Sequence, residues 1–123
     1  MTEAELQRRI DEIRASNPDL WHPDTQAALQ GVHLQRADAL GSTVEAEAHL
    51  RAAEDCQWSI GTAATGAGEG LASMGRLYEI RARRARLWEA LGDRAAARDL
   101  WESIAADPNG LGAFAKAELA RLG

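Results

Sequence analysis

Apolar residues recur at steps of three and four along most of the chain, which is the spacing of one face of a helix. The pattern is clearest on either side of Gly92. The apolar positions there are Leu77, Ile80, Leu87 and Leu91 before the glycine, and Ala97, Leu100, Trp101, Ile104 and Ala105 after it. Gly92 is suited to end one helix, and the carboxylate of Asp93 can cap the next. Residues 78–108 are therefore predicted to form a helical hairpin.

The same reasoning predicts helices along the rest of the chain. Thr2 and Glu5 have the spacing of a capping box, and Pro23 suits a first helical turn. The expected helices cover residues 2–16, 23–40, 43–62, 69–91, 93–106 and 111–122. β-Branched residues are scarce, which argues against a sheet. We therefore expect one all-α domain over residues 1–123, with about six helices in stacked antiparallel hairpins or a related helical bundle.

The hairpin at residues 78–108 resembles a tetratricopeptide repeat. That family has a small residue in its first helix, a Gly-Asp turn, small and aromatic residues in its second helix, and a closing Asp-Pro. The matching positions are Ala85, Gly92, Asp93, Ala97, Trp101, Asp107 and Pro108. The chain departs from the family at Arg84, where leucine is usual, and at Ile104, where a small residue is usual. The resemblance implies stacked helical hairpins that hold a peptide or helix in a groove.

Composition and charge narrow the classes of function. The chain has 19 acidic and 14 basic residues and a net charge of −5, which disfavours nucleic-acid binding. Its four tryptophans and its many alanines favour a packed helical core over disorder. A single cysteine excludes an internal disulfide. We find neither a signal peptide nor an apolar run long enough to span a membrane, so we expect a cytoplasmic protein with no membrane partner.

The connection at residues 17–23 carries a tryptophan, Trp21, between two prolines. We expect Trp21 to pack against the second helix and hold the first helix in place. The alternative is an exposed aromatic anchor for a partner, since tryptophan is enriched at binding hot spots.

A second unusual stretch, residues 61–75, holds five glycines. Its small residues are expected to allow a turn followed by very close helix contact. These residues are Gly61, Thr65, Gly66 and Gly70. The alternative is a helix N-terminus that binds an anionic ligand.

Arg81 and Arg84 fall in the apolar sector of the helix expected at residues 69–91. An arginine in such a sector needs a partner. One interpretation is an ion pair with Glu54, with Asp55 or with an acid of the first helix. The other is that both arginines line a groove and bind carboxylates of a partner, because guanidinium groups bind carboxylates through paired hydrogen bonds.

A metal or nucleophile site is a weaker possibility. Glu45 and His49 are one helical turn apart, and His33 can face them from the second helix, with Cys56 nearby in sequence. Neither a His-Glu-x-x-His motif nor paired Glu-x-x-His motifs are present. We therefore predict no metal site, no catalytic residue and no cofactor.

The leading hypothesis is a non-enzymatic protein–protein interaction module, a small adaptor or chaperone-like protein that binds a peptide or helix in a groove. The expected partner-binding residues are Trp21, Trp58, Tyr78, Arg81 and Arg84. One alternative is a structural homo-oligomer, such as a homodimer, in which a symmetric partner supplies missing burial. The other is a helical bundle that binds a metal or a small ligand.

Overall fold

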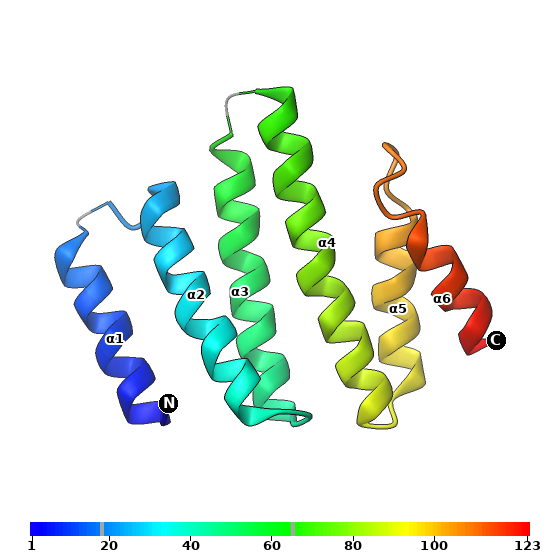
Figure 1. Cartoon of the computed structure of the whole chain (residues 1–123), viewed down its shortest axis with the longest axis horizontal. Coiled ribbons are helices and arrows are strands. Elements are labelled where there is room, and N and C mark those ends of the chain that lie inside the picture. The colour runs from blue at the N-terminus through cyan, green and yellow to red at the C-terminus, as the bar shows by residue number, and fades with distance from the viewer. Residues whose placement is uncertain (18, 65) are drawn as a thin grey trace.

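The computed structural model describes residues 1–17, 19–64 and 66–123, and these residues form six α-helices and no strand (Figure 1). The helices are α1 (Glu3–Ser16), α2 (Pro23–Leu40), α3 (Val44–Thr62), α4 (Ala67–Ala90), α5 (Arg94–Ala105) and α6 (Phe114–Leu122). The predicted all-α class is confirmed. The largest difference from the expected bounds is at α6, because residues 111–113 form turns before the helix begins.

Short-range signals set the helix ends. Thr2 accepts a hydrogen bond from the Glu5 amide at 3.1 Å, and the Glu5 carboxylate accepts one from the Thr2 amide at 3.3 Å, which completes the predicted capping box. The side chains of Thr43 and Asp93 cap α3 and α5 by accepting a hydrogen bond from a backbone amide, without a reciprocal bond. Gly92 has a φ of 87°, a value that favours glycine, so the chain can turn tightly between α4 and α5.

The helices lie side by side in chain order and alternate in direction (Figure 1). Among the described residues, the helix backbones come close to one another only between neighbours in the sequence. Side-chain ion pairs also reach the next helix but one, from Glu3 to His49, from Asp38 to Arg83 and from Glu89 to Arg121. A closed bundle would also bring the first and last helices together. The structure is therefore an open array of antiparallel helices with two free ends.

The described part of the chain buries its apolar side chains in three clusters. One joins α4, α5 and α6 around Trp101, which is fully buried. A second joins α1 and α2 through Leu6, Ile10, Leu29 and Val32, and takes in Cys56 of α3. The third joins the ends of α2, α3 and α4 near their turns; its members are Ala37, Ala46, Leu50 and Leu87.

Polar side chains link α3 to α4 between these clusters. Arg84, which is only 8% exposed, donates to Glu47 at 2.8 Å and to Glu54 at 3.1 Å. Farther along, the Gln57 amide donates to the Ser73 hydroxyl at 2.7 Å. We call these contacts the polar seam. Buried polar groups need partners of this kind, and together they fix how α4 lies on α3.

The expected packing of Trp21 is wrong, because its side chain is 74% exposed. Leu6 and Ile10 of α1, and not Trp21, pack in the apolar cluster with Leu29 and Val32 of α2. The connection is held by polar contacts instead: Asp19 accepts from the Trp21 amide at 3.1 Å, and Gln26 donates to the carbonyl of the residue before Trp21. Trp21 is therefore left on the surface.

The expected close contact at the glycine-rich stretch is confirmed at Gly61. A Cβ atom there would lie 2.9 Å from the Ser73 hydroxyl oxygen of α4, so α3 and α4 approach closely at this point. Gly66 lies in the predicted turn, just before α4. Gly70 lies within α4 and has no neighbour within 4 Å, so the expected close contact is wrong there. Thr65 lies outside the described residues.

Candidate functional site

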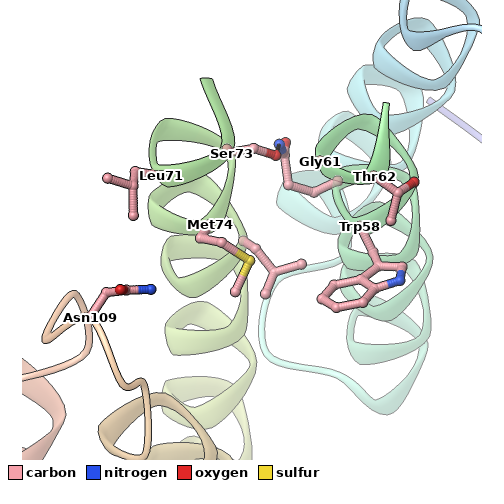
Figure 2. A pocket seen from close by; sticks show the side chains of 10 residues that line it. Trp58, Gly61, Thr62, Leu71, Ser73, Met74 and Asn109 are labelled. Atoms are coloured by element: carbon pink, nitrogen blue, oxygen red, sulfur yellow. Dashed lines mark hydrogen bonds between the residues drawn. The ribbon is translucent and has the colours of Figure 1, made fainter. Parts of the chain in front are cut away.

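A pocket of about 460 Å³ opens where the end of α3, the start of α4 and the connection between α5 and α6 meet (Figure 2). The lining residues are Gln57, Trp58, Gly61, Thr62, Gly70, Leu71, Ser73, Met74, Leu77 and Asn109. A volume of this size accommodates a small molecule or a large side chain of a partner.

Two large apolar side chains stand at the rim of the pocket. Trp58 of α3 is 57% exposed, and Leu71 of α4 is 44% exposed. Figure 2 shows them on opposite sides of Met74, whose flexible thioether side chain suits irregular partners. Exposed apolar side chains gathered around a hollow are typical of surfaces that bind another molecule.

Two buried polar side chains in the pocket lining already have hydrogen-bond partners within the chain. Gln57 and Ser73 are both buried and are joined by the 2.7 Å hydrogen bond of the polar seam. Gln57 also accepts from Gln30 of α2 at 2.9 Å. Because these groups already have partners within the chain, the free energy of binding a ligand would come mainly from the apolar walls.

Tyr78, expected to contact a partner, is buried beside the pocket and supports it. Its hydroxyl donates to one oxygen of Asp107 at 2.6 Å, and the other oxygen of Asp107 accepts from the amides of Asn109 and Leu111, each at 3.0 Å. Burial and the neighbouring Asp107 carboxylate raise the pKa of Tyr78 to about 12. Tyr78 thereby holds the α5–α6 connection that places Asn109 at the pocket edge.

Replacing Tyr78 by phenylalanine should loosen this connection while leaving α4 intact. We expect the free energy of unfolding to fall by about 1 kcal/mol, the usual contribution of one hydrogen bond. Hydrogen exchange should become faster at the amides of Asn109 and Leu111, and stay unchanged in α2. Unaltered exchange at these two amides would contradict the supporting role of Tyr78.

Arg81 and Arg84 do not line the pocket. Both form ion pairs with Glu54, one of the acids expected from the sequence, and Arg84 also contacts Glu47. Arg81 further lies above the ring of Tyr78, 5.9 Å from its centroid. Of the five expected partner-binding residues, Trp58 alone lines the pocket.

Leu71, Met74 and Asn109 line the pocket but were not predicted to lie together. Leu71 and Met74 have the three-residue spacing of a helix face, which marks them as apolar neighbours on α4. Asn109 arrives from a connection whose path depends on the Tyr78–Asp107 contact. No local signal in the sequence indicates that path.

His33 and His49 do face each other, with their Nδ1 atoms 3.1 Å apart. The carboxylate beside the pair belongs to Glu3 of α1, 3.1 Å from His49 Nε2, and not to Glu45, which is exposed. Burial raises the pKa of the Cys56 thiol to about 11, which makes it a poor nucleophile. Within residues 1–17, 19–64 and 66–123, no group of three or more such side chains is arranged to hold a metal ion.

In the part of the chain that the structure describes, no helix has both the length and the apolar character needed to cross a membrane. Comparison of the chain with protein-family models, with curated proteins and with solved structures found no match. The pocket bordered by Trp58 and Leu71 is the strongest candidate for a binding site.

Proposed function

We propose that the chain is a non-enzymatic protein–protein interaction module, a small cytoplasmic adaptor or chaperone-like protein. Its partner would be a peptide or helix bound across the pocket at α3 and α4. The observation that supports this most strongly is the pair of exposed apolar side chains, Trp58 and Leu71, on either side of a hollow. The resemblance of residues 78–108 to a tetratricopeptide repeat points in the same direction.

In the proposed complex, one apolar side chain of the partner inserts between Trp58 and Leu71 and contacts Met74. Fully burying a leucine or phenylalanine side chain contributes about 1.5–3 kcal/mol, and Trp58 would lose its own exposed area as well. The amide of Asn109 would hydrogen-bond to the partner's backbone at the edge of the pocket. The apolar insertion supplies affinity, and the Asn109 contact supplies orientation.

A small apolar ligand is the second candidate, favoured by the volume of the pocket, about 460 Å³. Its binding would use the same walls. The two candidates differ in their contacts with the rim of the pocket. A small ligand would sit within the hollow, whereas a peptide would also contact the exposed faces of Trp58 and Leu71.

Peptides selected from a random library on the immobilised protein provide the probe for this proposal. Fluorescence polarisation with a selected peptide should show at least tenfold weaker binding to Trp58→Ala and to Leu71→Ala. Such a loss corresponds to about 1.4 kcal/mol for each anchor. Trp21→Ala is the matched control, because Trp21 is an exposed tryptophan on a different connection. Exposed substitutions change stability little, so all three variants should fold.

Other outcomes separate the alternatives. Binding that depends on Trp21 and not on Trp58 would move the site to the α1–α2 connection and contradict the proposal. Failure to select any peptide, together with a bound small molecule in a native mass spectrum, would favour the second candidate. A homodimer that dissociates in Trp58→Ala would show that a second copy occupies the pocket.

A further inference from the structure

Three polar side chains form a hydrogen-bonded chain across α2, α3 and α4, which we call the glutamine relay. Gln30 of α2 donates through Nε2 to the carbonyl of Ala53 at 3.1 Å and to Oε1 of Gln57 at 2.9 Å. Gln57 in turn donates through Nε2 to the hydroxyl oxygen of Ser73 at 2.7 Å. Figure 2 shows the Ser73 side chain extending from α4 toward α3. The relay therefore ends at Ser73, which lines the pocket.

The backbone carbonyl of Ala53 fixes the direction of every bond in the relay. A carbonyl can only accept, so the atom of Gln30 that contacts it is the amide nitrogen. The atom of Gln57 that meets this nitrogen is then its oxygen, which turns the Gln57 nitrogen toward Ser73. Because an amide nitrogen can only donate, the Ser73 hydroxyl oxygen accepts this last bond.

The proton of the Ser73 hydroxyl is left without an acceptor in the described part of the chain. A serine hydroxyl has one proton to donate and two lone pairs, and the bond from Gln57 occupies one lone pair. The Ser73 side chain is only 3% exposed. A buried donor without an acceptor is unfavourable. A ligand that brings an acceptor to this point would therefore gain a hydrogen bond that a wholly apolar ligand cannot make.

We infer that Ser73 is a specificity-determining residue of the pocket, which favours an apolar group ending in an oxygen that accepts the Ser73 proton. This inference rests on the proposed function, because it names the side chain that the partner inserts between Trp58 and Leu71. Among large side chains with an apolar body, only tyrosine ends in an oxygen. The anchor of the partner is therefore a tyrosine, with its ring against the apolar walls and its hydroxyl at Ser73.

The relay also has a place for the proton of the tyrosine hydroxyl. A carbonyl oxygen has two lone pairs, and Gln30 uses only one of those on Oε1 of Gln57. A phenol that accepts from Ser73 can donate to the other. Both hydrogen-bonding functions of a phenol are thus matched by groups in the pocket lining.

Ser73 also lines a second hollow, of about 500 Å³, together with Ile60, Ala64 and Arg76. Among the described residues that line this second hollow, neither Trp58 nor Leu71 is included. A ligand that reaches Ser73 from the proposed site must therefore bind more weakly when Trp58 is truncated.

p-Cresol, which is the side chain of tyrosine, and p-xylene, which has a methyl group in place of the hydroxyl, are the probes. Titrations would be followed by NMR through the backbone amides of Gly61 and Leu71. The ratio of the two dissociation constants is compared between variants, so the difference in hydrophobicity between the probes cancels. We expect Ser73→Ala to shift this ratio at least fivefold in favour of p-xylene. Trp58→Ala should weaken the binding of p-cresol.

A double variant and a control accompany Ser73→Ala. Ser73→Ala/Gln57→Met removes both polar groups and leaves the Gln30 amide paired with the Ala53 carbonyl. It should shift the ratio in the same direction, and it keeps the inference testable if Ser73→Ala fails to fold. Leu71→Ala is the matched control, because Leu71 borders the same pocket without a polar group. It should weaken both probes and leave the ratio within twofold.

The outcomes separate this inference from the proposed function. No binding of p-cresol, an unchanged ratio in the folded Ser73 variants, or p-cresol binding that is unaffected by Trp58→Ala would overturn the role of Ser73. The proposed function fails in another way, if no selected peptide depends on Trp58. A shifted ratio without such peptides would support the chemistry assigned to Ser73 and favour a small ligand as the occupant.

Discussion

Replacing Arg84 by methionine is expected to lower the free energy of unfolding by about 3 kcal/mol. The change removes the guanidinium group from between the buried carboxylates of Glu47 and Glu54, which then face each other across an apolar side chain. This is the lower end of the range for a broken buried ion pair, because Arg51 and Arg81 still contact the two carboxylates. Urea denaturation followed by circular dichroism measures the difference.

A combined variant separates the lost charge from the lost packing. Changing Glu47 and Glu54 to glutamine together with Arg84→Met removes the uncompensated charges, so most of the stability should return. Arg76→Met is the control on the same helix, because Arg76 is exposed, and its effect should stay within about 0.5 kcal/mol. Equal stability of Arg84→Met and the unaltered chain would mean that the ion pairs of the polar seam add nothing.

Replacing Gly112 by alanine should cost about 3 kcal/mol as well, for a steric reason. A Cβ atom at this position would overlap the backbone carbonyl of Ile104 in α5, well inside the 3.0 Å that real Cβ atoms keep. A backbone group cannot swing aside as a flexible side chain can. The start of α6 would have to move, which would weaken the packing of Ala115 and Leu122 in the cluster around Trp101.

Gly75→Ala is the matched control for this substitution. Gly75 lies within α4, and a Cβ atom there would have no neighbour within 4 Å. Because alanine favours a helix over glycine, this variant should be more stable by about 0.5–1 kcal/mol. Thermal unfolding of the two variants should therefore shift in opposite directions. A Gly112→Ala protein as stable as the unaltered chain would show that the α5–α6 corner is not closely packed.

The helices were predictable because their signals act over a few residues. Thr2 binds the amide of Glu5, three residues away, and Asp93 caps the helix that it precedes. α2 begins at its proline as expected. The connection that carries Trp21 is held by backbone contacts with Asp19 and Gln26, which do not determine whether the tryptophan ring is buried, and its orientation was predicted wrongly.

The pocket was less predictable, because it forms where segments far apart in the sequence meet. Trp58 could be singled out as a large aromatic side chain, but Asn109 reaches the same pocket only through the contact between Tyr78 and Asp107. For Arg84 the sequence indicated the need for an acidic partner. It did not identify Glu47 as that partner, because several acidic residues of α3 could have paired with Arg84 equally well.

The open array also determines the order in which the chain can assemble. Because, among the described residues, the helix backbones pack only between neighbours in sequence, each helix finds its main packing partner as soon as the helix before it is made. A helix leaving the ribosome can dock as soon as its predecessor is in place, because the backbone contacts between helices join neighbours in the sequence. Assembly from the first helix to the last therefore needs no late rearrangement.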